Sequence, residues 1–413
     1  MIKILHTADV HLDSPLKSLA LRDPELQEKV QTATRSAFMR IVDTAVSEEV
    51  AALLISGDLF DGAERSAKTA AFLMEQLDRL QNSGIIVFYI KGNHDAENPI
   101  TGEISLPENV RIFDGRGGKF QVGNLDVWVH GVSFSAKQAP ESLLPKFGTP
   151  EPDAINIAML HTSLAGSQGH DTYAPCSVAE ITRMGFDYWA LGHVHKRQVH
   201  CQSPWIVMPG IPQGRDIGEP GPKSATLITI VGKNITVSEV PTSAAEFIEV
   251  RVALDGIESD DELRHHIRAV LSETAQGLIS DAGLVRLIIG GKTPRKWQIL
   301  RDQDSWCEVV AEIARSTGVL WVERTKFENI TEIEGTTADG SAITELERLM
   351  DEIRLEPAFA SELTTSIKTI LAEIPPKRRS ILMPDEAAAE ELARALSETG
   401  ATGVLAAMKG ASE

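Results

Sequence analysis

Short apolar runs alternate with longer amphipathic stretches along the first 240 residues of the chain. The runs are short and rich in β-branched side chains, which favours strands over buried helices. We predict strands at residues 2–5, 51–55, 85–90, 125–132, 155–160, 187–191, 205–208 and 225–231.

Two amphipathic stretches separate the first three of these strands. The second stretch covers residues 65–81, and the apolar positions of the first fall on one helix face: Leu26, Val30, Ala37, Ile41 and Ala45. A βαβαβ opening followed by further strands indicates an α/β layered sheet structure. Residues 209–223 are so rich in glycine and proline that we expect an irregular loop there.

A second, smaller pattern begins near residue 247. It alternates strand and helix: strand 247–254, helix 261–274, strand 284–289, helix 305–316 and strand 319–324. From about residue 343 the pattern is helical and amphipathic, and prolines interrupt it at 375, 376 and 384. We therefore expect an α/β domain at residues 1–240, a small α/β domain at 241–335 and a helical tail at 336–413.

Composition narrows the class of protein. The 413 residues are 42% hydrophobic and 24% charged, which is typical of a globular protein rather than a disordered one. Three distant cysteines rule out a disulfide framework, so a reducing cytoplasm is the expected compartment. The first six residues turn polar too quickly for a signal peptide, and no apolar run approaches the ~18 residues of a membrane span.

The formal net charge of −19 is an objection to nucleic-acid binding, because phosphate binding normally needs a basic surface. Residues 241–413 hold 31 of the 59 acids but only 19 of the 40 bases, so the acid excess is greatest outside the first domain. The charge therefore predicts weak nonspecific binding of DNA by this chain alone, with affinity supplied by local cations, metals or a partner.

Metal-ligand residue types stand five times at the C-terminal end of a predicted strand, which is the edge where open α/β sheets bind ligands. Each motif alone could be a turn, a cap or a buried histidine, but five coinciding by accident is very improbable. Carboxylate, imidazole and amide oxygen together suit Mn²⁺, Fe²⁺ or Zn²⁺. The motifs are Asp9-Val10-His11, Gly57-Asp58-Leu59-Phe60-Asp61, Gly92-Asn93-His94-Asp95, His161 and Gly192-His193-Val194-His195.

This series resembles the motifs of the calcineurin-like metallophosphoesterases. Within that superfamily the chain length, the small second domain and the helical tail are most similar to the SbcD-type DNA repair exonucleases. Residues 9–16 lack the glycine that usually follows His-Leu in that group and resemble the YhaO-like subgroup instead. The resemblance implies a layered β-sandwich flanked by helices over residues 1–240, a small α/β cap and a helical tail.

The resemblance also implies a site for two divalent ions that share Asp58. Mn²⁺ is the expected ion, with Fe²⁺ and Zn²⁺ as alternatives. Two such ions can stabilise the attacking and the leaving oxygen of a displacement at phosphorus and activate a water. The first ion would be held by Asp9, His11, Asp58 and His195, and the second by Asp58, Asn93, His161 and His193.

His94 resembles the catalytic histidine of the family. It would protonate the leaving oxygen or stabilise negative charge on the phosphate. Asp61 and Asp95 could orient the histidines, or they could be ordinary turn residues.

The implied substrate is DNA, which the protein would cleave as an exonuclease or an endonuclease. Protein phosphatases of the superfamily are a poorer match, because Gly62-Ala63 follows Asp61 and an aspartate ends the third motif. Local cations could bind DNA phosphates or simply be solvated, and Trp297 could stack on a base or lie in a core. The candidate DNA-binding residues are Lys196, Arg197, Lys292, Arg295 and Lys296.

Partners follow from the resemblance alone. The cap would limit which DNA ends enter, the tail would dock on the coiled coil of an SMC-like ABC-type ATPase, and the protein would be a homodimer. The apolar positions of the tail could equally pack on the chain itself. Two other functions stay open: a metallophosphodiesterase acting on a small nucleotide, and a regulatory subunit of an ATPase complex.

Overall fold

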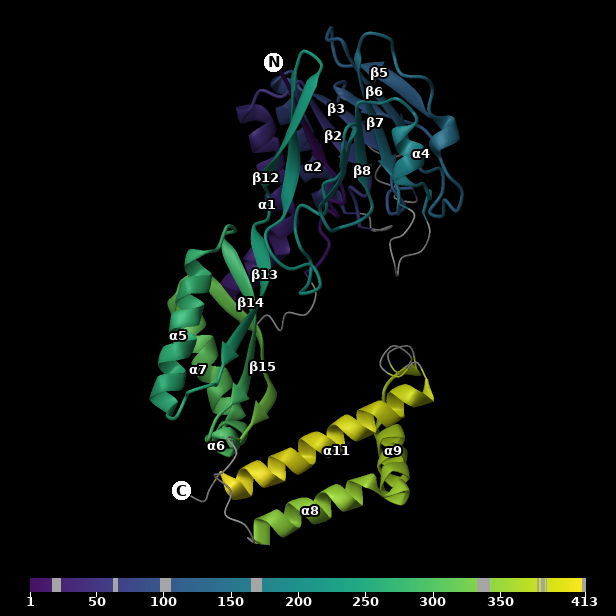
Figure 1. Cartoon of the computed structure of the whole chain (residues 1–413). Helices are drawn as coiled ribbons and strands as arrows, with labels where there is room; N and C mark the ends of the chain where they lie inside the picture. The colour runs from purple at the N-terminus through teal and green to yellow at the C-terminus, as the bar shows by residue number, and fades with distance from the viewer. Residues whose placement is uncertain are drawn as a thin grey trace. The chain divides into compact units, whose positions relative to one another are not determined.

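The structure is a computed structural model that describes all residues except 17–23, 62–65, 97–104, 165–172, 333–341, 377–378, 380–382, 384 and 411–413. It forms two compact units (Figure 1). The first comprises residues 1–249, 275–286 and 319–323, and the second comprises residues 250–274, 287–318 and 324–413.

Two six-stranded sheets build the first unit. One sheet has the order β12-β11-β1-β2-β3-β4 and the other the order β5-β6-β7-β8-β10-β9. The first sheet consists of β1 (Ile2–Thr7), β2 (Ala52–Ser56), β3 (Ile86–Ile90), β4 (Val110–Ile112), β11 (Ser224–Val231) and β12 (Asn234–Pro241). The second consists of β5 (Gly118–Gln121), β6 (Val127–Val132), β7 (Ile155–His161), β8 (Tyr188–Gly192), β9 (Gln198–Gln202) and β10 (Trp205–Met208).

Alternation of side chains along the strands makes the unit layered. In β2, Leu54 faces the core between the two sheets, whereas Leu53 packs against the helices α1 (Pro24–Ser47) and α2 (Ala67–Asn82). In β7, Ile157 faces the same inner core and Leu160 packs in a third cluster with Ile181 of α4 (Val178–Thr182). The sheets are thus covered by helices on both outer faces (Figure 1).

The central strands of both sheets run parallel, so their carboxyl ends share one edge. β1 pairs in parallel with β2, and β2 with β3, up to the pair Ser56–Ile90. In the second sheet β7 and β8 are parallel up to the pair His161–Gly192. The sequence motifs follow five of these strands: β1, β2, β3, β7 and β8. This register brings the carboxyl ends of these strands level with one another within each sheet.

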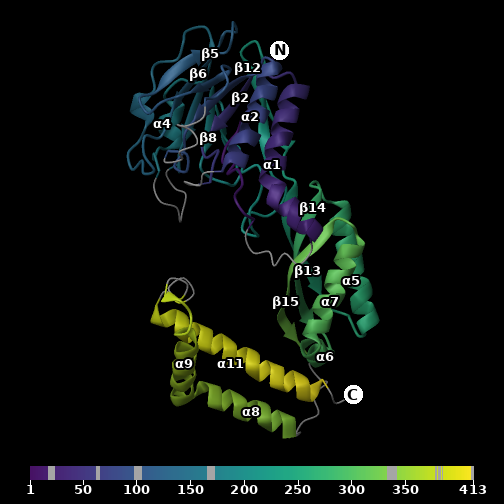
Figure 2. The ribbon, with the colours of Figure 1, turned by 180° about the vertical axis from the view of Figure 1, so that it is seen from behind.

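The second unit contains helices and part of a three-stranded sheet, whose strands begin in the first unit or end in it. The sheet has the order β13 (Ala245–Ala253), β14 (Ala282–Lys292), β15 (Leu320–Thr331), and α5 (Asp260–Gln276) and α7 (Gln303–Ser316) lie along it (Figure 2). The tail contributes α8 (Ala342–Leu355), α9 (Pro357–Leu371) and α11 (Glu386–Lys409). α11 packs on α6 (Lys296–Arg301) through Leu405, Ala406 and the buried Trp297.

The prediction of an α/β layered sheet structure is confirmed. The expected strands agree with the observed ones to within a few residues, except that β15 runs seven residues beyond its predicted end. Four strands were missed: β4, β5, β9 and β12. β4 has only three residues, and the other three are largely exposed, so they lack the apolar run by which a buried strand is recognised. Among the described helices, none is long and apolar enough to cross a membrane.

Truncating Leu54 tests the inner core. Its side chain is fully buried between the sheets, so Leu54→Ala should lower the free energy of unfolding by about 2–5 kcal/mol through lost burial and a residual cavity. The control is Val231→Ala, at a side chain that is 57% exposed, which should change it by less than about 0.5 kcal/mol. Urea unfolding followed by circular dichroism measures both. Equal effects of the two variants would contradict the layered core.

Candidate metal centre

Four residues at the strand ends have a left-handed backbone, which is uncommon outside glycine. Asp9 has φ 52°, His11 φ 43°, Asp58 φ 51° and His193 φ 102°. The loops hold one another in place, since the amide of Asp9 donates to Gly57 O at 2.9 Å and that of His11 donates to Asp58 O at 3.0 Å. Strained backbone held in this way is typical of functional sites.

Close packing at the same edge requires glycine in three of the motifs, and at Gly57 a Cβ would stand 2.4 Å from His161 Nδ1. A Cβ on Gly92 would stand 2.2 Å from Asp58 Oδ1, and one on Gly192 would stand 2.0 Å from Ser56 O. All three distances are well inside van der Waals contact. The glycines therefore leave the space that the Asp58 carboxylate and the neighbouring strand end occupy.

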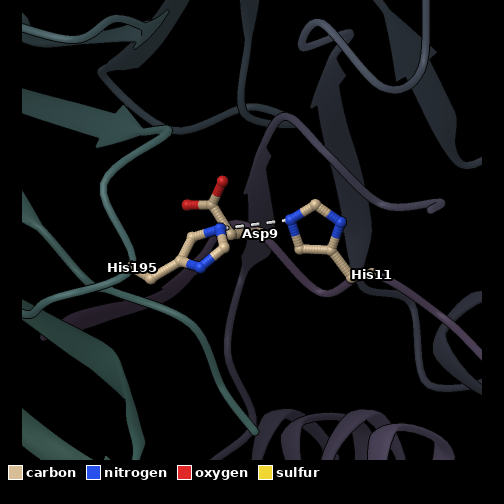
Figure 3. A group of neighbouring side chains, drawn as sticks. All are labelled: Asp9, His11 and His195. Atoms are coloured by element: carbon tan, nitrogen blue, oxygen red, sulfur yellow. Dashed lines mark hydrogen bonds between the residues drawn. The ribbon is translucent and has the colours of Figure 1, made fainter. Parts of the chain in front are cut away.

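The first group of metal-ligand side chains is Asp9, His11 and His195 (Figure 3). Their candidate ligand atoms all lie within 4.8 Å of one another, and the two Nε2 atoms are 3.3 Å apart. Asp9 is fully buried, and its carboxylate accepts a hydrogen bond of 2.9 Å from the amide of His193. Burial raises the pKa of Asp9, against the attraction of the nearby histidines.

A second group consists of Asp58, His161 and His193, again within 4.8 Å. Asn93 belongs to it as well, because its Oδ1 lies 3.1 Å from His161 Nε2. Asp58 Oδ2 is 3.4 Å from His161 Nε2 and 4.0 Å from His11 Nε2. One carboxylate oxygen therefore faces both groups.

The hydrogen bonds of His161 define which of its nitrogens is available. Nδ1 lies 2.9 Å from the carbonyl oxygen of Ser56, which can only accept, so Nδ1 carries the hydrogen. In a neutral ring Nε2 then points its lone pair at two oxygens, those of Asn93 and Asp58. Burial lowers the pKa of His161, but the charge of Asp58 outweighs it and raises the pKa to about 9.

These side chains fit a divalent cation. Carboxylates, imidazole nitrogens and an amide oxygen converge here, and the charge of Asp58 favours a positive partner beside it. A cation would remove the repulsion between the converging lone pairs and leave the second nitrogen of His161 bonded to backbone, as metal-binding histidines usually are.

His94 forms a third such group with His11 and Asp58, and Asp61 lies beside it. The amide of His94 donates to Asp58 Oδ1 at 2.9 Å, and its ring meets that of His11 edge-on at 4.9 Å between centroids. Asp61 Oδ1 is 3.5 Å from Nδ1 of both His11 and His94, so it stands between the two rings. The nearby ring of His11 lowers the pKa of Asp61.

Asp95 has a different environment. Its carboxylate accepts from the amides of Phe60 and Gly92, both at 3.0 Å, and it is fully buried. Burial and then the charge of Asp58 raise its pKa to about 6. Asp95 thus ties the loop after β2 to the loop after β3.

A cavity of about 950 Å³ opens over these side chains. Asp58, Asn93, His94, His193 and His195 line one part of it. Residues from the glycine- and proline-rich loop 209–223 line another part. The site therefore has room for a ligand much larger than a metal ion.

Comparison with known proteins identifies two regions of the chain. Residues 2–197 match the family described as calcineurin-like phosphoesterase. This region of the chain is a calcineurin-like phosphoesterase domain. Residues 247–329 match the middle domain of the metallophosphoesterase YhaO. The expected superfamily and YhaO-like subgroup are confirmed.

Two kinds of relative support the homology. The metallophosphoesterase YhaO of Bacillus subtilis is 36% identical over 240 residues, which are 57% of this chain and 59% of that protein. The DNA double-strand break repair protein Mre11 of Methanosarcina mazei is 26% identical over 270 residues, covering 63% of this chain and 41% of its own length. The matches therefore span roughly half of these two relatives. A dimetal phosphatase from Danio rerio aligns with 59% of this chain at 10% identity and a TM-score of 0.37, from which we draw nothing.

Beyond the phosphoesterase motifs, the structure reveals Glu219, which sequence reasoning missed. His195 Nδ1 lies 2.6 Å from Glu219 Oε1. Burial raises the pKa of Glu219, but the bond to His195 outweighs it and lowers the pKa to about 2, so the carboxylate accepts and Nδ1 donates. No spacing rule connects a loop acid to a histidine 24 positions earlier, so the sequence carried no signal for this pair.

The predicted DNA-binding residues fall in two places. Lys196 and Arg197 line the cavity, but Arg197 already pairs with Glu239 at 3.0 Å and donates to Thr226 at 2.6 Å. Lys292, Arg295 and Lys296 belong to the second unit. There Arg295 pairs with Asp260 at 2.9 Å, and Lys296 lies 4.2 Å above the ring of Trp297, whose Nε1 donates to Glu332.

Divalent metal should bind more tightly as the pH rises. His161 must be neutral to offer Nε2 to a metal, yet a pKa of about 9 keeps its ring protonated at neutral pH. The apparent affinity for Mn²⁺ should therefore increase by up to about tenfold per pH unit below about pH 9 and then level off. Calorimetry in buffers of different ionisation enthalpy should show proton release near pH 7. An affinity independent of pH between about 6 and 8.5 would contradict this view of His161.

Glu219 should matter for metal affinity although it is not expected to touch the metal. Glu219→Gln removes the charge that holds the His195 ring, so affinity for Mn²⁺ should fall by about tenfold or more. Glu239→Gln is the matched control, because Glu239 lines the same cavity but pairs with Arg197. Calorimetric titration with Mn²⁺ compares them, and equal affinities would refute the positioning role.

Proposed function

We propose that this chain is a divalent-metal-dependent nuclease that hydrolyses phosphodiester bonds of DNA. The observation that carries the proposal is the position of Asp58, whose carboxylate faces two groups of metal-ligand side chains at once. A shared carboxylate is the simplest way to hold two cations a few ångströms apart, as two-metal phosphoesterases require.

The proposed ligands are those of the two groups. Asp9, His11, Asp58 and His195 would hold one ion, and Asp58, Asn93, His161 and His193 the other. The donor set suits Mn²⁺ best, with Fe²⁺ and Zn²⁺ as alternatives. When bound, the ions would draw charge from the phosphate oxygens and lower the pKa of a water.

His94 is the proposed proton donor to the leaving oxygen. It lines the cavity beside Asp58 but is not needed as a ligand, and its ring is partly exposed. Burial lowers its pKa, although the charges of Asp58 and Asp61 oppose this. Asp61, in contact with the rings of both His11 and His94, would position them.

DNA is the proposed substrate because relatives that match much of this chain bear the name DNA double-strand break repair protein. We further propose the boundaries 1–240 for the nuclease domain, 241–335 for a cap and 336–413 for a docking tail, acting in the cytoplasm as a homodimer. An SMC-like coiled-coil ATPase is the proposed partner. Support for docking comes from exposed apolar side chains on the tail helices: Leu349, Ile353, Leu355 and Ile370.

Replacing His94 separates catalysis from metal binding. His94→Asn should retain the Mn²⁺ stoichiometry of the wild type but lower the hydrolysis of end-labelled linear DNA by about 10²–10⁴-fold, because only the proton donor is lost. His200→Asn, at a half-buried histidine on β9 that does not line the cavity, is the control.

Unchanged hydrolysis in His94→Asn with Mn²⁺ bound would refute the role of His94. A wild type that hydrolyses nucleotide diesters but not linear DNA would favour a small-nucleotide phosphodiesterase. A wild type that binds Mn²⁺ but hydrolyses neither, while it stimulates a partner ATPase, would favour a regulatory subunit.

A further inference from the structure

The loop between β10 and β11 places one guanidinium, that of Arg215, in the wall of the cavity over the metal centre. Arg215 lines this cavity together with Asn93, His94 and His195, yet its side chain is only 15% exposed. A cation that is so far buried needs acceptors for its five N–H groups.

The described surroundings satisfy few of these donors. Glu219 Oε1 lies 3.5 Å from one terminal nitrogen, at the outer limit of a hydrogen bond. The same nitrogen is 3.2 Å from His195 Nδ1, but that atom donates its own hydrogen to Glu219 and has no lone pair to offer. Among the residues that the structure describes, the buried Nε has no hydrogen-bond partner. Arg215 is therefore a buried cation that is short of acceptors.

The loop holds Arg215 firmly in this position. The amide of Arg215 donates to Glu219 Oε2 at 2.7 Å, and the amide of Ile211 donates to the carbonyl of His195 at 2.9 Å. Glu219 thus fixes the backbone of Arg215 with one oxygen and the ring of His195 with the other. The guanidinium is held in place in advance of any ligand, which lowers the entropy cost of binding one.

The charge of Arg215 reaches the catalytic side of the cavity. Arg215 and His94 line the same cavity, together with Asn93 and His195. The guanidinium thus faces the same space as the proposed proton donor.

From this arrangement we infer that Arg215 binds a non-bridging oxygen of the substrate phosphate and completes a phosphate site with the metal centre. The inference rests on the proposed function for the substrate class, a phosphodiester anion. A guanidinium suits this ligand because its planar fork matches two phosphate oxygens and its charge does not depend on pH. Glu219 has a double role here, since one carboxylate positions both the phosphate-binding arginine and a proposed metal ligand.

Phosphate binding and turnover test the inference with Mn²⁺-loaded, full-length protein. Arg215→Gln removes the charge but keeps a polar side chain, and it should weaken binding of inorganic phosphate and lower kcat/KM for bis(p-nitrophenyl) phosphate by about 10- to 100-fold each. Arg215→Lys keeps the charge without the fork and should lose less. Arg183→Ala, at an exposed arginine that does not line the cavity, should behave like the wild type.

Mn²⁺ stoichiometry and circular dichroism of each variant complete the experiment, and both should be unchanged. Wild-type phosphate affinity in Arg215→Gln, or equal losses in the Gln and Lys variants, would overturn the inference. So would loss of Mn²⁺ in parallel with phosphate, since Arg215 would then only support His195. If the wild type hydrolyses no phosphodiester, the proposed function fails. The phosphate site still stands if Arg215→Gln binds inorganic phosphate more weakly than the wild type does.

Discussion

The buried carboxylate of Asp58 is the constraint around which the first unit is arranged. A charge that is removed from water must be compensated, and here the compensation comes from several strand ends at once. His161 from the second sheet, His11 from the loop after β1 and the amide of His94 after β3 all approach it. Gly92 has no side chain, and a Cβ at this position would clash with the Asp58 carboxylate. The parallel register of both sheets is what allows these contacts, because it brings the strand ends to one edge.

Much of the fold and of the metal centre could be predicted because both depend on buried, regularly spaced residues. Strands such as β2 and β7 are buried along their whole length, and their apolar runs reveal them. The motifs that follow them needed only the rule that parallel strands end together. Exposed strands gave no such signal, and β5, with four exposed residues, was missed.

Arg215 and Glu219 could not be found from the sequence either, because their importance comes from a loop that folds back on His195. Trp297, for which sequence left stacking and core open, is buried against α11.

The acidic character of the chain is compatible with a phosphate-binding site because the relevant charges are local. The cavity wall contains Lys196, Arg197, Arg215 and Lys223, although Arg197 is neutralised by Glu239. In the metal centre itself, buried carboxylates and converging imidazole nitrogens favour a cation. Long-range attraction of a polyanion is weak for such a chain, so binding must depend on short-range contacts. This makes the geometry of a single loop more important than net charge.

The left-handed backbone at Asp9, His11, Asp58 and His193 has a consequence for the stability of the whole protein. Each such residue costs roughly 1–3 kcal/mol of conformational strain, and the two buried aspartates add mutual repulsion when no cation separates them. This backbone strain subtracts from the stability of the fold, and it falls on residues whose side chains belong to the cluster. Glycine at these positions would relax the backbone, but it would also remove the side chains that compensate the buried charge of Asp58. The strain and the metal-ligand side chains are therefore kept or lost together.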